Sequence, residues 1–230
     1  MRIIATYFLL IILPIISFSQ TQIGIKSEYI YFWFSDHDEG HYTSEYDYPR
    51  SDYSLAIIAR HRIPETPLNF GLEIEYANRS FSVKSYSGGF GGGQSIDYSY
   101  TVGNLYFHFQ PQFTFGKKFR FYFYPGFYWG ILINSQLTGS LSGWQMGNPP
   151  YSGTIQVNGS AKDYYPNWEF GIYPGIGFEF PLYKQFDFIF DYSFTTNFSN
   201  TRYSWASDRV KMFSMNFGIG VIYNLSLLTD

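Results

Sequence analysis

The feature that most constrains the fold of this chain is an alternation of side chains with period two. In the segment Phe186–Phe198, nearly every second residue is phenylalanine or tyrosine, and most residues between them are polar. A β-strand places successive side chains on opposite faces, so a period of two indicates a strand. The segment therefore predicts a strand with one bulky aromatic face and one polar face.

The same alternation recurs along the chain and predicts about eight strands. These are Gln22–Phe34, Asp52–Ile63, Leu68–Val83, Tyr98–Phe115, Phe119–Asn134, Asn167–Pro181, Phe186–Phe198 and Val210–Leu225. Short turns and long polar connections alternate between them. The short turns are Ile63–Pro67, Gly116–Lys118 and Leu182–Gln185, and the long connections are Ser35–Ser51, Ser87–Asp97, Ser135–Pro166 and Ser199–Arg209. This pattern is typical of an antiparallel up-and-down β-barrel in a bacterial outer membrane, with periplasmic turns and extracellular loops.

Two kinds of closed barrel show such alternation, and side-chain size distinguishes them. A lipocalin-like soluble barrel has its apolar face inside, whereas a membrane barrel has it outside. Stripes of phenylalanine and tryptophan would overfill the narrow interior of a barrel of about eight strands. Aromatic residues make up 23% of the chain and charged residues only 14%, against about 25% charged residues in an average protein. We therefore expect an all-β transmembrane barrel with the aromatic face against lipid.

The polar face, which is expected inside, carries charges of both signs that can pair there. The inward set is Lys26, Arg60, Arg62, Arg79, Arg120, Glu28, Glu73, Glu75, Glu169, Glu179, Asp187 and Asp191. Only His61 and Lys211 fall on the outward face, and both lie near strand ends. Pro111, Pro125 and Pro174 lie inside strands, where each removes a ladder hydrogen bond, so we expect β-bulges there.

The rims carry further irregularities. The alternation fails at Ile30–Phe34 and slips after Tyr76, so both stretches are expected at the outer rim. Aromatic residues at strand ends indicate belts at the membrane interfaces, with ordinary strand packing as the alternative. The candidates are Tyr29, Tyr31, Trp33, Tyr53, Trp129, Trp168 and Tyr223.

The N-terminus has the features of a secretory signal. Arg2 precedes an apolar run at Ile3–Ile16, and small residues in Ser17–Ser19 predict cleavage before Gln20. The alternative, a transmembrane helix anchor, needs a run of about 18–20 apolar residues, which this segment lacks. We expect a signal peptide at 1–19 and a single outer-membrane barrel domain at 20–230. The chain has no cysteine and a net charge of −3, which argues against a disulfide framework and against a nucleic-acid partner.

Two predicted hairpins resemble a known family. The stretches Asn104–Phe113 and Phe121–Gly130 flank a Gly-Lys-Lys turn, and Trp168–Pro181 is followed by Phe186–Tyr192. In their pattern of glycine, proline and aromatic residues they are similar to the outer-membrane β-barrel proteins of Bacteroidetes, the PorT-like group. The resemblance extends over essentially the whole mature chain. It implies an outer-membrane barrel of about eight strands and transfers no catalytic residue.

Few residues point to site chemistry. The glycine-rich stretch Gly88–Gly93 lacks the Lys-Ser/Thr and the helix of a phosphate-binding loop, so a flexible loop is expected. One histidine, His108, falls on the inward face and is expected to be a satisfied lumen residue. The first long loop has an acidic and histidine-rich cluster, for which a solvated loop is favoured over a divalent cation site. Its members are Asp36, His37, Asp38, Glu39 and His41. We therefore predict no catalytic, cofactor-binding or metal-binding residues, no cofactor, and no enzyme.

Three roles remain open for such a barrel. The favoured role is structural or binding, through extracellular loops and chiefly Ser135–Pro166, around a lumen plugged by tyrosines and paired charges. The second is a component of an envelope transport or secretion machine, by family analogy alone. The third is a lipid-modifying outer-membrane enzyme. The expected partners are outer-membrane lipid, lipopolysaccharide and other envelope proteins.

Overall fold

The computed structural model describes residues 21–35, 43–47, 50–89, 91–145, 151–162, 165–198 and 211–225. The predicted signal peptide, 1–19, lies outside these residues. Among them there is no helix long and apolar enough to cross a bilayer. The strands are β1 (Thr21–Ser35), β2 (Thr43–Asp47), β3 (Arg50–Arg62), β4 (Leu68–Gly89), β5 (Gly92–Phe115), β6 (Arg120–Gln145), β7 (Tyr151–Gly159), β8 (Trp168–Tyr183), β9 (Phe186–Asn197) and β10 (Lys211–Asn224).

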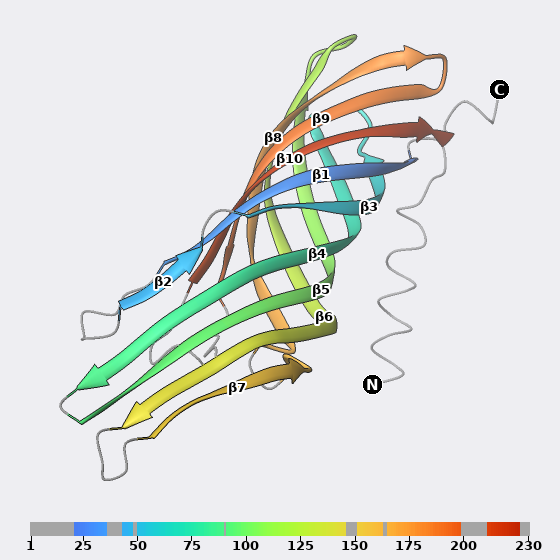
Figure 1. Ribbon diagram of the computed structural model, residues 1–230. Coiled ribbons are helices and arrows are strands. Elements are labelled where there is room, and N and C mark those ends of the chain that lie inside the picture. Colours follow the sequence, from blue (N-terminus) through green and yellow to red (C-terminus); the bar gives the residue numbers. More distant parts are fainter. Residues whose placement is uncertain are drawn as a thin grey trace, which may run out of the picture.

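Eight of these strands form a closed antiparallel barrel (Figure 1). Each of β1, β3, β4, β5, β6, β8, β9 and β10 pairs with the next in that order, and β1 closes the ring on β10 from Gln22↔Asn224 to Ser35↔Lys211. These are the eight strands predicted from the alternation. The all-β up-and-down topology is therefore confirmed.

The three predicted short turns lie at one end of the barrel. They connect β3 to β4, β5 to β6 and β8 to β9. Gly116 in the second turn has φ 96°, and Lys184 in the third has φ 44°, in the left-handed region that such tight reversals use. Because the barrel strands alternate in direction, β1 begins and β10 ends at this same end.

The opposite end differs from the prediction, because three of the long connections contain strands. With 22, 24 and 26 residues, β4, β5 and β6 are the longest strands, and they continue well beyond the rest of the barrel (Figure 1). β2 pairs with β4, and β7 pairs with β6. We call β2, β7 and the outer parts of β4–β6 the extended sheet. The expected flexible loop at Gly88–Gly93 is instead a hairpin tip in which Gly88 pairs with Gly93. The fourth long connection, 199–209, lies outside the described residues.

The two faces of the barrel wall are assigned as predicted. Inward side chains include the buried charges and tyrosines, and the outward side chains are large, apolar and exposed. Exposed outward residues include Ile25, Leu55, Ile57, Leu72, Ile74, Phe107, Phe109, Phe123, Phe127, Phe170, Phe178, Phe190, Phe217 and Ile219. A water-soluble barrel would bury this set, so the wall suits a lipid environment.

The polarity of both faces inverts in the extended sheet. On β4 the outward residues change from Ile74 and Tyr76 to Asn78 and Ser80, whereas on the inward face Phe81 follows the charged positions. The alternation of burial continues past Tyr76 to Ser80 and the β4–β5 register is constant, so the slip in the sequence pattern is no change of register, and the stretch lies toward the extended sheet, at the rim where it was expected. The chemistry of the outward face changes instead, from apolar to hydroxyl-bearing.

A β-bulge in β6 changes which of its residues face inward, so that apolar residues of β6 also face inward where the polarity inverts. The β5–β6 register shifts between Gly103 and Asn104, which leaves Ile133 as an extra residue on β6. Beyond this bulge, Leu137 is buried on the inward face, opposite Tyr100. Without the extra residue, Leu137 would point outward among hydroxyl groups.

Pro111, Pro125 and Pro174 do not cause bulges, contrary to expectation. The β5–β6 ladder has the same register on both sides of Pro111, with Phe109↔Phe127 before it and Phe113↔Phe123 after it. Pro125 of β6 is paired with Pro174 of β8. The φ angle of proline suits an extended strand, so each proline removes one donor and the strand needs no extra residue. The three prolines occupy outward positions on three neighbouring strands, where the β5–β6 and β8–β9 ladders are interrupted.

The aromatic residues assigned to the membrane interfaces lie on the outer surface of the barrel. Tyr29 and Tyr53 are paired across β1 and β3 with ring centroids 5.5 Å apart, close to where the outward face becomes polar. Tyr223 lies near the short turns, 5.0 Å from the ring of Phe186. His61 is outward at the strand end, as predicted, and the side chain of Lys211 lies outside the description. The stretch at Ile30 lies at the end of β1 toward the extended sheet, as expected, and its residues Ile30 and Phe32 face inward into an apolar cluster described below.

Tyrosine rings inside the barrel lie across glycines of the neighbouring strands. Tyr124 is paired with Gly175 and Tyr122 with Gly177, and each ring occupies the space that a glycine Cβ would need. A glycine in a strand lacks side-chain packing, and an aromatic ring laid across it restores that packing. The same arrangement joins Tyr106 to Gly130.

Replacing Gly175 with alanine should therefore destabilise the barrel. The added methyl group would clash with the Tyr124 ring, and overpacking of this kind costs about 1–3 kcal/mol. The matched control is Gly143→Ala in the extended sheet, where the nearest atom is the Gly93 carbonyl oxygen at 3.8 Å. Urea unfolding of the refolded proteins in lipid vesicles measures both variants. Equal stability of the two would contradict the interlocking of rings and glycines.

Candidate functional site

The predicted inward charges are all inside the barrel, where they form three groups along its axis. Ten of the twelve are nearly fully buried, and Arg62 and Arg120 are partly exposed near the short turns. A buried charge is tolerated when it is paired and hydrogen-bonded. Each of these side chains lies within ion-pair distance of an opposite charge, Glu75 pairing with His108 when that imidazole is protonated.

The middle group, which we call the central cluster, surrounds Lys26. Its Nζ atom lies 2.6 Å from Glu28 Oε1, 2.8 Å from Glu73 Oε2 and 3.3 Å from Asp191 Oδ2. Tyr173 donates a hydrogen bond to Glu28 Oε1 over 2.9 Å and its hydroxyl lies 3.2 Å from Nζ. The lysine therefore joins carboxylates from β1, β4 and β9 across the lumen.

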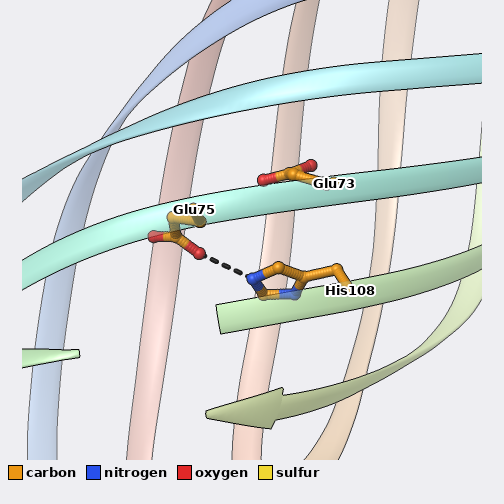
Figure 2. Close-up of side chains that lie close together, drawn as sticks. All are labelled: Glu73, Glu75 and His108. Carbon is orange, nitrogen blue, oxygen red and sulfur yellow. Dashed lines mark hydrogen bonds and ion pairs between the residues drawn. The ribbon is translucent and has the colours of Figure 1, made fainter. Parts of the chain in front are cut away.

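The cluster continues to His108 on β5. His108 is opposite Glu73 in the β4–β5 register, and Glu75 lies two residues further along β4 on the same face. Figure 2 shows the imidazole extending from β5 toward the two carboxylates, with Nε2 at 2.7 Å from Glu75 Oε2. One ligand-type atom from each of the three side chains lies within 4.8 Å of the others.

The group near the short turns is rich in arginine. Glu179 on β8 accepts hydrogen bonds from Arg62, at 2.6 Å, and from Arg120. Arg120 also donates to Asp187 Oδ2 over 2.6 Å. Arg60 lies over the Tyr122 ring, 4.6 Å from its centroid. These contacts fill the lower lumen.

Above the central cluster, a third ion pair lies beneath an apolar cluster. Arg79 Nη1 is 3.5 Å from Glu169 Oε1 and its guanidinium lies over the Tyr106 ring, whose hydroxyl donates to the same carboxylate. The apolar cluster that covers this pair is the plug. It includes Ile30, Phe32, Ala77, Phe81, Tyr100, Val102, Leu137, Ala161, Tyr165 and Met212. The lumen is thus filled from the arginines to the plug, in agreement with the sequence prediction.

The structure describes only some of the candidate site residues that sequence analysis identified. The acidic and histidine-rich cluster at Asp36–His41 lies outside the described residues. His108 is in the lumen, as predicted, but it is only partly satisfied, because Nε2 contacts Glu75 whereas Nδ1 has no hydrogen-bond partner among the described residues. What sequence analysis missed is its approach to Glu73 and Glu75. The i, i+2 spacing of the two acids was a signal, but only the strand register places His108 opposite them.

Removing the positive charge of Lys26 should strongly destabilise the barrel. In Lys26→Met the carboxylates of Glu28, Glu73 and Asp191 would lose their shared cation, and breaking a buried pair in this way costs about 3–5 kcal/mol. Lys162→Met is the control, since that exposed side chain should change stability by less than about 0.5 kcal/mol. Adding Glu73→Gln to Lys26→Met should restore part of the loss. Urea unfolding without these differences would contradict the assigned role of Lys26.

A filled lumen should conduct no ions. We expect the purified protein in planar lipid bilayers to show no stable channel, because the buried side chains of the plug and the tyrosines beneath it occupy the lumen in the part of the chain that the structure describes. Folding of the same sample is checked by its heat-dependent migration on gels. Large, long-lived conductance steps from folded protein would contradict the packing described here.

The comparison with known families agrees with this architecture. The chain matches the family described as "Outer membrane protein beta-barrel domain" over residues 18–203. No curated protein matches it in sequence. Similar solved structures include Neisserial surface protein A, at 12% identity over 89% of this chain and 96% of that one, with TM-score 0.44. OprG of Pseudomonas aeruginosa has 13% identity over 89% and 95%, with TM-score 0.43. Ail of Yersinia pestis has 12% identity over 89% and 99%, with TM-score 0.38.

The assignment to a family depends on the strand pairing and on the family match, which covers most of the chain. The weak similarities in shape to the solved structures add nothing to this assignment. A closed antiparallel wall with apolar side chains outward and paired charges inward is the arrangement that a lipid bilayer requires of a β-protein. The chain belongs to the family of outer membrane proteins with a β-barrel domain, and its place is the bacterial outer membrane.

Proposed function

We propose that the barrel holds the extended sheet outside the membrane as a binding surface, and that a partner protein adds an extended segment to this sheet along β7. The role is binding and not catalysis. The observation that carries the proposal is the contrast between a filled, rigid barrel and a sheet that projects from only one side of it (Figure 1).

The edge strand β7 has the chemistry of a docking site for another strand. Among the described residues it pairs with β6 alone, so its outer edge presents unpaired backbone groups. Its sequence, YSGTIQVNG, contains no charge and no proline. Proteins normally protect an exposed edge with lysine, proline or a bulge. An unprotected edge of nine residues suits strand addition, in which backbone hydrogen bonds supply affinity.

The outward face of the extended sheet supports a second contact, with the sugars of lipopolysaccharide. This face is lined by serine, threonine and glutamine, with Ser80 beside Thr101 and Ser142 beside Thr154. Short hydroxyl side chains can donate to and accept from sugar hydroxyls. Lipid and lipopolysaccharide are thus the proposed surroundings of the wall and the sheet, and an envelope or surface protein is the proposed partner.

Two other inferences complete the proposal. The PorT-like group of Bacteroidetes is the proposed subfamily, on the motifs at Asn104–Phe113 and Trp168–Pro181. A lipid-modifying activity is disfavoured because His108, the best placed histidine, lies in the lumen beneath the plug and away from the outer leaflet.

Photo-cross-linking in intact cells tests the binding edge. A photo-reactive amino acid at Thr154, on β7, should capture one specific partner protein. The matched control is the same amino acid at Ser95, which lies in the same cross-strand row and on the same face but two strands inside the edge. Ser95 should give at least tenfold less product.

Proline substitutions separate strand addition from mere proximity. Consecutive N–H groups of a strand point to opposite edges. One of the two substitutions Ile155→Pro and Gln156→Pro therefore removes a donor from the outer edge. One of the two variants should lose the Thr154 adduct while the protein still folds in the membrane. The proposal fails if Thr154 and Ser95 behave alike, or if the captured partner is a second copy of this chain.

A further inference from the structure

We propose that the central cluster binds a divalent transition-metal ion, of the zinc type, through Glu73, Glu75 and His108. The site lies inside the barrel wall, on two neighbouring strands, and differs from the extended sheet. It is independent of the proposed function, because no step of that proposal uses the lumen.

The first argument is the balance of charge. One lysine, Lys26, faces the carboxylates of Glu28, Glu73, Glu75 and Asp191. All five side chains are almost fully buried. With a neutral imidazole, the ionised cluster has an excess of three negative charges. The other two groups offset only part of it, since Arg79 is matched by Glu169, and the three arginines near the short turns exceed Glu179 and Asp187 by one positive charge. Unbalanced charge in a medium that excludes water is strongly unfavourable.

The second argument is the hydrogen-bond inventory. Glu73 Oε1, Glu28 Oε2 and Asp191 Oδ1 are buried oxygen atoms that no described side chain or backbone group contacts as a donor. A carboxylate oxygen can only accept, so each of these atoms needs a cation, a proton or a hydrogen-bond donor such as water. Glu73 uses its other oxygen for Lys26 and for Gln110, at 2.8 and 3.0 Å, which leaves Oε1 available as a ligand.

The third argument is geometry. Glu73 and Glu75 point to the same side of β4, and His108 extends toward them from β5 (Figure 2). One ligand-type atom from each of the three side chains lies within 4.8 Å of the other two. Zinc binds nitrogen and carboxylate oxygen at about 2.0–2.2 Å, so small side-chain rotations would bring all three to one ion. The ion would separate Nε2 of His108 from Glu75 Oε2, now at 2.7 Å.

The donor set selects the class of metal. One imidazole nitrogen with two carboxylates suits zinc, manganese or iron, whereas magnesium and calcium prefer oxygen ligands alone. Two carboxylates and a neutral imidazole also neutralise a divalent ion. Binding would reduce the excess negative charge of the cluster from three to one.

Refolding in the presence of metal tests the site, because the ion then needs no path through the plug of the folded barrel. The chain is refolded into detergent micelles with or without zinc chloride, desalted, and analysed for metal by mass spectrometry. We expect about one zinc per chain and a higher melting temperature than for the sample refolded with a chelator. Zinc-loaded protein should also lose its metal and its extra thermal stability when it is unfolded and refolded without zinc.

Variants locate the ion. His108→Gln retains a hydrogen-bond donor for Glu75 and should bind zinc at least tenfold more weakly, and Glu73→Gln should do the same. His61→Gln is the matched control, because His61 lies on the outward face near a strand end. The melting temperature without metal shows that each variant folds. The proposal is overturned if the wild-type chain retains no zinc, which would assign the charge balance to protons, or if His61→Gln loses zinc as His108→Gln does.

Discussion

The pairing of β1 with β10 is the contact on which the rest of the structure depends. It runs along the full length of both strands and turns an open sheet into a ring without edges. In a bilayer, where no water can satisfy a free backbone group, a β-sheet is stable only as such a ring. Closure also separates two environments, and the chain places phenylalanine on one side of the wall and paired carboxylates on the other.

Side chains must then fill the interior, and the charges inside it must be paired. Tyrosine rings laid over glycines fill the space between strands, and their hydroxyls reach the carboxylates, as Tyr173 reaches Glu28 and Tyr106 reaches Glu169. A larger residue in place of Gly175 would displace a ring and, through it, the charges beside the ring. Packing and electrostatics inside this barrel are therefore coupled, and neither can be altered alone.

Sequence reasoning could predict the eight strands, the short turns and the inward charges, because each depends on alternation within a single segment. It could not predict the extended sheet. There the polarity of both faces inverts. After Tyr76 the side chains still alternate between the two faces, but a polar residue no longer indicates the inward face. The expectation of a β-bulge at Pro111 was also wrong. It considered one strand alone, whereas the neighbouring strands keep a constant register on both sides of this proline.

The same limit applies to the site. Glu73, Glu75 and His108 were each placed inward, but their meeting depends on which residue of β5 stands opposite which residue of β4. That register follows from the turns and bulges of the whole barrel.

The row of prolines has a consequence for how the wall comes apart. Beside this row the β5–β6 and β8–β9 ladders each lack successive rungs, whereas the seam between β1 and β10 is uninterrupted. Thermal opening of the cylinder would therefore start in mid-wall and not at the junction of the chain ends. Amide hydrogens of β5, β6 and β8 near this row would exchange with solvent before those of the terminal strands.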